Sequence, residues 1–305
     1  MLRRGRFVST PAEAGLWSDG DAQAAEQMIR PRRSVLFTPG SNARALEKIR
    51  ALDCDVVALD LEDSVAPEAK DAARGAVCAL VAEKAFQNKE VVVRINSLST
   101  PYGHADLEAV AKAHPDAVIL PKVSGPAEVG GAHRALPSSI ALWAMIETPR
   151  GVLHLDAIAT AGASCLILGS NDLTKDLGAR PMAGRENLWA AMSLIVLTAR
   201  AHGLTAIDGT YNAFPDSAGF AAACEQGRDF GFHGKTVIHP SHIETANRVF
   251  APSPAELDEA RRILAAFAKH PDKSVIALDG RMVEKLHAEE AARLLALAEA
   301  IQNRC

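Results

Sequence analysis

Two carboxylate residues, Glu147 and Asp172, each follow a short apolar run that reads as a buried strand. The residues between the two runs open with a Thr-Pro-Arg-Gly turn and continue with helical spacing, so residues 142–172 form one predicted strand–helix–strand unit. Because parallel strands end at the same edge of a sheet, we expect both carboxylates at neighbouring positions of one edge. Two oxygen donors suit a hard divalent cation that keeps coordination positions open for water and substrate. Two solvated loop acids are the alternative interpretation.

Polar residues follow the other apolar runs in the same way. Read along the chain, the strand ends carry Phe37 and Thr38, then Asp60, Glu62 and Asp63, then Arg94, Lys122, Ser170, Asp208 and His239. Several have a structural interpretation: Asp60 and Asp208 as caps of a helix or turn, Lys122 as an ion-pair partner at a rim, and His239 as a packed loop residue.

Arg94 is harder to explain structurally, because it directly follows three valines and a charge among apolar residues needs a partner. A substrate carboxylate matches the geometry of the guanidinium group. One cationic residue among several acids therefore suggests an anionic substrate bound beside a metal ion.

Strand-like and helical segments alternate along the chain. The predicted strands are 34–38, 56–60, 91–95, 117–120, the two strands of the 142–172 unit, 205–207 and 236–238. Eight strands alternating with eight helices predict an α/β fold of the TIM type, a (β/α)₈ barrel, in which chemistry lies at the C-terminal ends of the strands. A doubly wound open sheet is the alternative, but TPGSNAR after the first strand lacks the GxGxxG pattern of nucleotide-binding sheets.

The chain is predicted to have three parts. Residues 1–30 form an N-terminal arm, expected to be loosely ordered, in which either Met1 or Met28 can be the start of translation. Residues 31–252 form the barrel. Pro252 and Pro254 mark the boundary of a C-terminal helical extension, 253–305, with helices at 255–269 and 283–302 joined by strand-like residues 274–278.

Composition narrows the function classes. The 305 residues are 48% hydrophobic, enough for a large core, and the net charge of −4 without a long basic run gives no reason to expect nucleic acid as a partner. No run approaches the roughly 18 apolar residues of a membrane span. Five scattered cysteines without a CxxC pair are typical of reduced thiols in the cytoplasm, and the ten histidines include no HExxH pattern of a zinc hydrolase.

The order of the strand-end motifs is similar to that of a known family. Between Arg32 and Glu284 the chain contains RRSVLFTPGSN, LDLEDSV, VVRIN, ILPKV, IETPRG, LGSNDL, GFHGKTVIHP and DGRMVE. This series resembles the citrate lyase β-subunit-like, or CoA-ester lyase, branch of the HpcH/HpaI aldolase superfamily, which includes malyl-CoA and citramalyl-CoA lyases.

The resemblance implies roles for the strand-end residues. It implies Mg²⁺ held by Glu147 and Asp172, with Glu62 and Asp63 supporting the site, and Arg94 on the substrate carboxylate or thioester oxygen. It implies CoA contacts from Phe37, Arg44, Lys48, Ile238 and His239.

The family takes its catalytic acid from a C-terminal pattern G-x-M-[IV]-Asp, which here reads Gly280 to Glu284. Glutamate keeps the carboxylate but adds a methylene. In the family this segment covers the barrel of a neighbouring subunit, so the resemblance implies a homo-oligomer, a trimer or hexamer.

The expected activity is Mg²⁺-dependent, reversible carbon–carbon cleavage of a 3-hydroxyacyl-CoA to acetyl-CoA and a 2-oxo acid, with Arg94, Glu284 and Glu62 as the catalytic residues. The alternatives are a CoA-independent class II aldolase acting on hydroxy-oxo acids, an acyl-CoA thioesterase, and a non-catalytic acyl-CoA-binding barrel. The sequence leaves open which oxo acid and stereoisomer are used, and whether the acyl carrier is CoA or a carrier protein.

Overall fold

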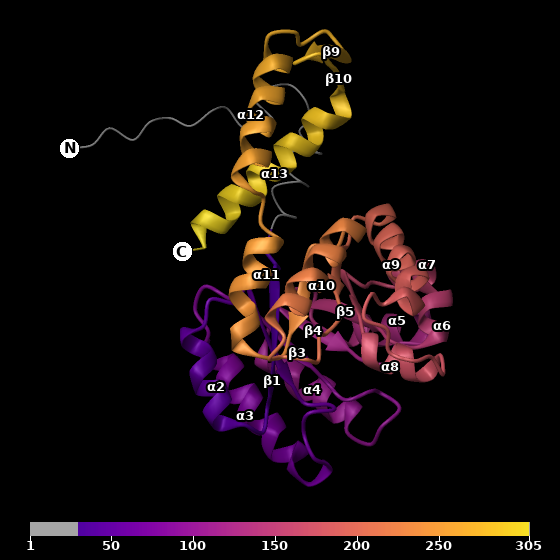
Figure 1. Cartoon of the computed structure of the whole chain (residues 1–305). Coiled ribbons are helices and arrows are strands. Elements are labelled where there is room, and N and C mark those ends of the chain that lie inside the picture. The colour runs from indigo at the N-terminus through magenta and orange to yellow at the C-terminus, as the bar shows by residue number, and fades with distance from the viewer. Residues whose placement is uncertain (1–29, 305) are drawn as a thin grey trace, which may run out of the picture. The chain divides into compact units, whose positions relative to one another are not determined.

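Eight parallel strands close into a barrel in the computed structural model, which describes residues 30–304 (Figure 1). Each strand pairs with its neighbours in the chain, and the first pairs with the last. The strands are β1 (Ser34–Pro39), β2 (Val56–Asp60), β3 (Glu90–Arg94), β4 (Ala117–Leu120), β5 (Ala141–Ile146), β6 (Cys165–Leu168), β7 (Thr205–Asp208) and β8 (Gly234–Val237). The predicted (β/α)₈ barrel is therefore confirmed.

Helices surround this barrel between successive strands. They are α2 (Ala43–Lys48), α3 (Lys70–Ala82), α4 (Gly103–Ala113), α5 (Pro126–Ala135), α6 (Pro149–Leu153), α7 (Leu155–Thr160), α8 (Ser170–Asp176), α9 (Trp189–Ala201), α10 (Ser217–Phe230) and α11 (Ile243–Val249), with short 3-10 turns η1 (Ile49–Ala51), η2 (Pro67–Ala69), η3 (Glu186–Leu188) and η4 (Pro240–His242). The short helix α8 was not foreseen, and it begins directly after β6.

The alternation of side chains along each strand separates two cores. On β2, Val56 and Ala58 belong to a small cluster inside the barrel, whereas Val57 and Leu59 belong to the larger cluster beneath the helices. The interior cluster is filled by side chains such as Trp143, so the barrel centre is a packed core and no channel runs through it. By the same alternation, Asp60 continues the inward row at the end of β2.

A buried ion cluster lies outside the barrel wall, at the end of β7 and the start of β8. Asp208 accepts hydrogen bonds of 2.6 Å from both Lys235 Nζ and Arg185 Nη1, and Asp208 and Lys235 are each 0% exposed. Burial by itself would raise the pKa of Asp208, but these two cations outweigh it and hold the pKa below its ordinary value. Asp208 therefore has a structural role, although its strand-end position had made it a candidate for the site.

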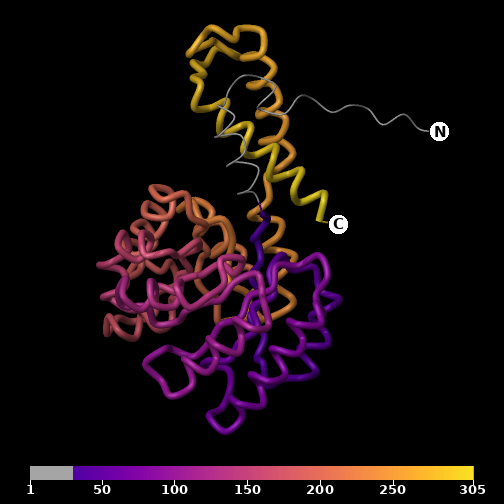
Figure 2. The backbone as a smooth tube through the Cα atoms, turned by 180° about the vertical axis from the view of Figure 1, so that it is seen from behind, coloured from indigo at the N-terminus to yellow at the C-terminus, as the bar shows by residue number. Residues whose placement is uncertain are grey.

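A second compact unit follows the barrel unit Arg32–Phe250 and begins at Ala251. It contains α12 (Pro254–Ala268), β9 (Val275–Leu278), β10 (Arg281–Glu284) and α13 (Lys285–Asn303). Figure 2 shows α12 and α13 running side by side, joined by the antiparallel hairpin of β9 and β10. The predicted helix start at 283 was wrong, because Val283 pairs with Ile276 in this hairpin. The three predicted parts of the chain stay a proposal, and the predicted arm and Met28 lie outside the described residues, apart from Arg30.

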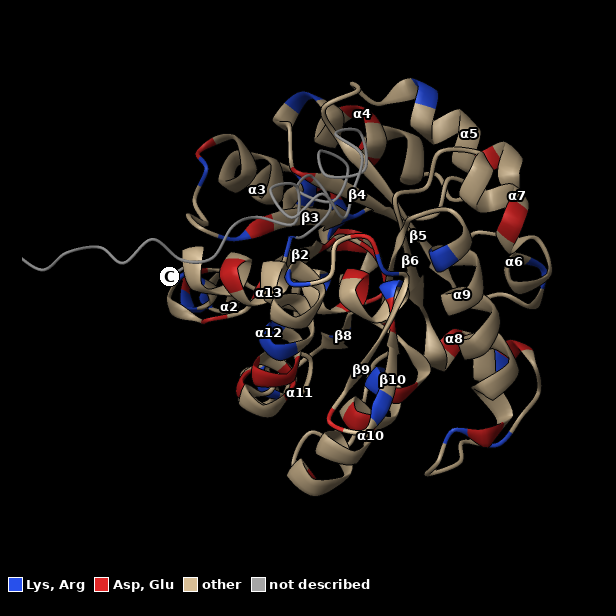
Figure 3. Cartoon of the chain, turned by 90° about the horizontal axis from the view of Figure 1, so that it is seen from above, with Lys and Arg blue, Asp and Glu red and all other residues tan. Residues whose placement is uncertain are grey.

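Charges of both signs are interspersed over the helices of the barrel unit in Figure 3, in keeping with a net charge near zero. Within residues 30–304, no helix combines the length and apolar character that crossing a membrane requires.

Removing the acid of the buried ion cluster should destabilise the barrel strongly. Asp208→Ala leaves Lys235 buried without its partner, so we expect the free energy of unfolding to fall by about 3–5 kcal/mol. Urea unfolding measures this loss. Asp156→Ala is the control, because Asp156 is exposed and its pairing with His202 is worth less than about 1 kcal/mol. Equal effects of the two substitutions would contradict the structural role of the cluster.

Candidate active site

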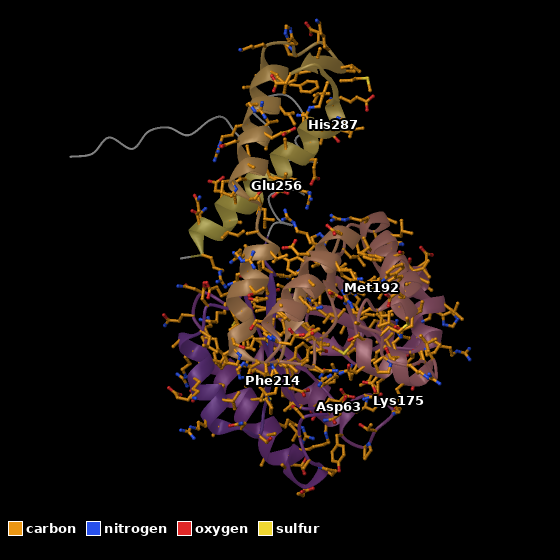
Figure 4. The ribbon with its side chains drawn as sticks, in the orientation of Figure 1. Asp63, Lys175, Met192, Phe214, Glu256 and His287 are labelled. Carbon is orange, nitrogen blue, oxygen red and sulfur yellow. The ribbon has the colours of Figure 1, made fainter. Side chains whose placement is uncertain are left out.

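A pocket of about 380 Å³ opens at the C-terminal ends of the barrel strands. Figure 4 shows Asp63, Phe214 and Lys175 at this end of the barrel unit. The pocket is lined by residues from seven of the eight strand ends: Phe37, Thr38, Pro39, Asp60, Asp63, Ser64, Arg94, Met145, Glu147, Leu168, Gly169, Ser170, Asn171, Asp172, Thr210, Asn212, Thr236 and Ile238. The structure therefore brings Glu147, Asp172 and Arg94 to one pocket, and their roles stay predictions.

Glu147 directly follows β5 and is held by residues that follow the neighbouring strands β4 and β6. Its Oε1 accepts a hydrogen bond of 2.7 Å from the backbone N–H of Lys122, and a Cβ at Gly169 would lie 2.3 Å from its Oε2. Only glycine at position 169 leaves room for the carboxylate. Burial, followed by the negative charge of Glu62, raises the pKa of Glu147 to about 8.

Asp172 lies in the first turn of α8, directly after β6. The start of this helix is tied to the β7 loop, because Asn171 and Asn212 exchange side-chain hydrogen bonds of 3.2 and 2.8 Å, and Ser170 Oγ donates to the carbonyl of Thr210 at 3.4 Å. The charge of Asp172 is close enough to contribute to the raised pKa of Glu147. The two carboxylates therefore face one pocket from adjacent strands.

Arg94 forms a buried fork with Asp60 across β2 and β3. Its Nε and Nη2 donate to the two Asp60 oxygens at 2.7 Å each, and Asp60 and Arg94 are register partners in the sheet. The guanidinium also lies 3.2 Å from Glu62 Oε2 and over the ring of Phe37. Burial alone would raise the pKa of Asp60, but Arg94 holds it below its ordinary value. The charge on Arg94 thus has a protein partner, which the sequence argument had sought in the substrate.

Glu62 and Asp63 are held by the ammonium group of Lys122. Lys122 Nζ donates to Glu62 Oε1 and, at 3.1 Å, to Asp63 Oδ1. The backbone around Glu62 is fixed as well, since Lys70 Nζ donates to its carbonyl at 3.0 Å. Burial raises the pKa of Glu62 even though Arg94 and Lys122 act against it. Lys122 therefore has the ion-pairing role that its structural interpretation gave it.

The remaining predicted residues fall into three groups. Phe37 and Ile238 line the pocket, and His239 lies at its side, where its ring stacks on Phe214 at 5.0 Å. Arg44 and Lys48 are exposed on α2 and do not line the pocket. Glu284 ends β10 in the second unit, where its backbone N–H donates to His287 Nδ1 at 3.0 Å. The roles of all these residues stay predictions.

Some lining residues were missed because they precede the strand ends. Met145 and Thr236 lie within β5 and β8, two residues before Glu147 and Ile238, and belong to the same inward rows. Period-two alternation counted back from each strand end would have found them. Asn212 and Thr210 lie in the β7 loop, and no strand pattern pointed to them.

The donor set fits a hard divalent cation. The ion pairs of Arg94 and Lys122 go to Asp60, Glu62 and Asp63, so Glu147 and Asp172 are the carboxylates left to a cation. Both offer oxygen, the ligand atom that magnesium prefers. Within the part of the chain that the structure describes, no group of three or more His, Cys, Asp or Glu residues could by itself hold a metal. Two protein ligands would leave the other coordination positions of a magnesium ion open to substrate and water.

Comparison with known proteins agrees with this geometry. The model of the HpcH/HpaI aldolase/citrate lyase family matches residues 33–240, and that of the carbon–carbon bond lyases of the TIM-barrel fold matches residues 195–301. The chain is 47% identical to the (3S)-malyl-CoA thioesterase of Cereibacter sphaeroides, over 89% of this chain and 96% of that protein. It is 31% identical to the mitochondrial citramalyl-CoA lyase of Rattus norvegicus, over 95% of this chain and 93% of that protein.

Among solved structures, the chain is similar to the CitE protein of Mycobacterium tuberculosis in complex with magnesium, acetoacetate and coenzyme A. The TM-score is 0.74 and the identity 32%, over 87% of this chain and 97% of that chain. Barrel, strand-end motifs and sequence identity agree, and the chain belongs to the HpcH/HpaI aldolase/citrate lyase family of carbon–carbon lyases.

Proposed function

We propose that this protein is a magnesium-dependent CoA-ester lyase that cleaves a 3-hydroxyacyl-CoA of the malyl or citramalyl type to acetyl-CoA and a 2-oxo acid. The observation that carries the proposal is the convergence of Glu147 and Asp172 on one pocket beside Arg94. Relatives named for malyl-CoA and citramalyl-CoA, and a solved structure with magnesium and coenzyme A, support the substrate class and the cofactor.

The residues of the pocket have different roles in the proposed reaction. Glu147 and Asp172 would hold the cation, which would supply positive charge next to the oxygens that gain negative charge as the bond breaks. Arg94 is fixed by Asp60, so its remaining N–H groups present a rigid positive charge to the substrate carboxylate or thioester oxygen. Glu62 helps to hold Arg94 and Lys122 in place.

The acid for the reaction is proposed to be Glu284. A proton leaves the substrate hydroxyl as the carbon–carbon bond breaks, and Glu284 delivers one to the acetyl carbon, so the reaction needs no net proton. Glu284 is proposed to come from the second unit of a neighbouring subunit in a trimer or hexamer. The phosphates of CoA would then reach Arg44 and Lys48 on α2, and its thiol end would pass Phe37, Ile238 and His239.

Hydrolysis of the thioester is a second candidate function. One observation favours it: the relatives at 47% identity are named malyl-CoA thioesterases. Both reactions use the same substrate class and the same cation, and they differ in the bond that breaks. Hydrolysis releases free CoA and a hydroxy diacid, whereas carbon–carbon cleavage releases acetyl-CoA and an oxo acid.

Product analysis distinguishes the two reactions and tests the cation ligands together. The purified protein is incubated with magnesium and malyl-CoA or citramalyl-CoA, and the CoA products are identified by mass spectrometry. Lyase activity gives acetyl-CoA, and hydrolysis gives free CoA. Glu147→Ala and Asp172→Ala should each lower the rate roughly a thousandfold, because a metal ligand contributes several kcal/mol. Exposed Glu108 on α4 provides the control substitution Glu108→Ala. Wild-type rates in either site variant would overturn the assignment.

The close approach of Gly169 to Glu147 gives a second test. In Gly169→Ala the new methyl group would lie 2.3 Å from Glu147 Oε2, so the carboxylate must move. We expect magnesium affinity, measured by calorimetry on the metal-free protein, to fall by about tenfold or more. Gly75→Ala is the matched control, because no atom lies within 4 Å of its added Cβ on α3 and alanine favours the helix. Unchanged affinity in Gly169→Ala would show that Glu147 does not bind the cation.

The proposed acid can be tested separately from the cation site. Glu284→Gln keeps the size of the side chain but cannot shuttle a proton, so exchange of the acetyl-CoA methyl hydrogens with deuterated water should stop. Binding of the oxo acid should remain within about twofold of wild type, because its contacts lie in the barrel. Undiminished exchange in the variant would assign the proton transfer to another residue.

A further inference from the structure

Five carboxylates lie in or next to the pocket that contains the proposed cation site: Glu62 and four that line the pocket. They are not equivalent. They come from β2, β5 and β6 and the residues that follow these strands: Asp60, Glu62, Asp63, Glu147 and Asp172. Arg94 pairs with Asp60 and Glu62, and Lys122 pairs with Glu62 and Asp63. Three of the five acids therefore form ion pairs with Arg94 or Lys122. The other two, Glu147 and Asp172, are the proposed ligands of the metal ion.

Lys122 contacts both groups of acids at once. Its ammonium holds Glu62 and Asp63, while its backbone N–H donates to Glu147 Oε1 at 2.7 Å. The residue has φ of +53°, a left-handed conformation that is uncommon for a residue with a side chain. In this conformation, the N–H of Lys122 points toward the end of β5 and its side chain points toward the end of β2.

Glu62 is the acid best placed to interfere with the cation site. It is buried, its Oε2 accepts no hydrogen bond, and it shares a partner with Glu147, because Lys122 donates to both carboxylates. A glutamate has three side-chain torsions, so a carboxylate released from its ion pair can turn toward a nearby cation. The ammonium of Lys122 opposes that rotation through its hydrogen bond to Oε1, whereas Arg94 lies 3.2 Å from Oε2 without forming a hydrogen bond to it.

We propose that Lys122 is a positioning residue that limits the cation site to two protein carboxylates by holding Glu62 and Asp63 away from it. The inference rests on the proposed function and goes beyond it, because it assigns the open coordination of the site to one side chain. A third carboxylate ligand would fill a position needed by the substrate and add negative charge beside an anionic substrate. Loss of the ammonium should therefore strengthen cation binding and weaken substrate binding.

The test measures these two affinities in Lys122→Met, which keeps the backbone N–H and a side chain of similar length. Calorimetry with magnesium alone should show binding about tenfold tighter than in wild type, because affinity rises with the number of charged ligands. Pyruvate, used as a 2-oxo acid probe at saturating magnesium, should bind about tenfold more weakly. Lys122→Arg keeps the positive charge and should stay within about threefold of wild type in both affinities. Lys112→Met removes an exposed ammonium from α4 and should change neither.

A double variant identifies Glu62 as the added ligand. In Lys122→Met with Glu62→Gln, the neutral amide is a poor third ligand, so magnesium affinity should return to within about threefold of wild type. If Lys122→Met is unfolded by circular dichroism, Lys122→Gly replaces it, since glycine favours positive φ and keeps the N–H.

A merely structural role for Lys122 predicts that both affinities fall together. Weaker or unchanged magnesium binding in the folded variant, with normal binding in wild type, would overturn this inference and leave the proposed function standing. A wild-type protein that binds no magnesium would overturn the proposed function, and the inference with it.

Discussion

Negative charge crowded at one end of a closed barrel is the constraint on which this site depends. Barrel closure brings carboxylates from β2, β5 and β6 to a single pocket, where burial raises the pKa of Glu147 to about 8. Two positively charged side chains offset part of this negative charge. Arg94 forms a two-pronged ion pair with Asp60, and Lys122 forms ion pairs with Glu62 and Asp63. The two remaining carboxylates, Glu147 and Asp172, can attract a divalent cation, and the pocket has room for an anionic ligand beside Arg94.

Backbone geometry sets this arrangement as much as side-chain chemistry does. Glycine at 169 leaves the space that Glu147 occupies, and the left-handed conformation of Lys122 directs an N–H at the same carboxylate. The helix α8 begins immediately after β6, which places Asp172 in its first turn and next to the pocket. Each of these devices acts over one or two residues at the end of a strand. The barrel can therefore keep its core unchanged while its strand ends carry the chemistry.

The contrast between the barrel core and the strand ends explains where prediction from the sequence succeeded and where it did not. Apolar runs and turn residues gave the eight strands, because burial of period-two rows is a local pattern. In the hairpin, β9 matches the predicted strand-like residues 274–278, but β10 was missed. Apart from Val283, the residues of β10 have exposed or half-buried side chains and show little alternation. Asp208 had the position of a site residue, but it belongs to the outward row and pairs with Lys235 beneath the helices. A difference of one residue along a strand decides between the two faces of the barrel wall.

The sequence by itself determined the barrel, the family resemblance, and the pairing of Glu147 with Asp172 at neighbouring strand ends, because strand order in a barrel follows chain order. It could not decide which acid pairs with which cation. Residues 34 to 60 positions apart, such as Asp60 and Arg94 or Glu62 and Lys122, meet only through sheet register and loop conformation. Only the tertiary structure therefore decided that Arg94 is held by the protein's own carboxylates, and that ion pairs engage Asp60, Glu62 and Asp63 rather than the two acids proposed as cation ligands.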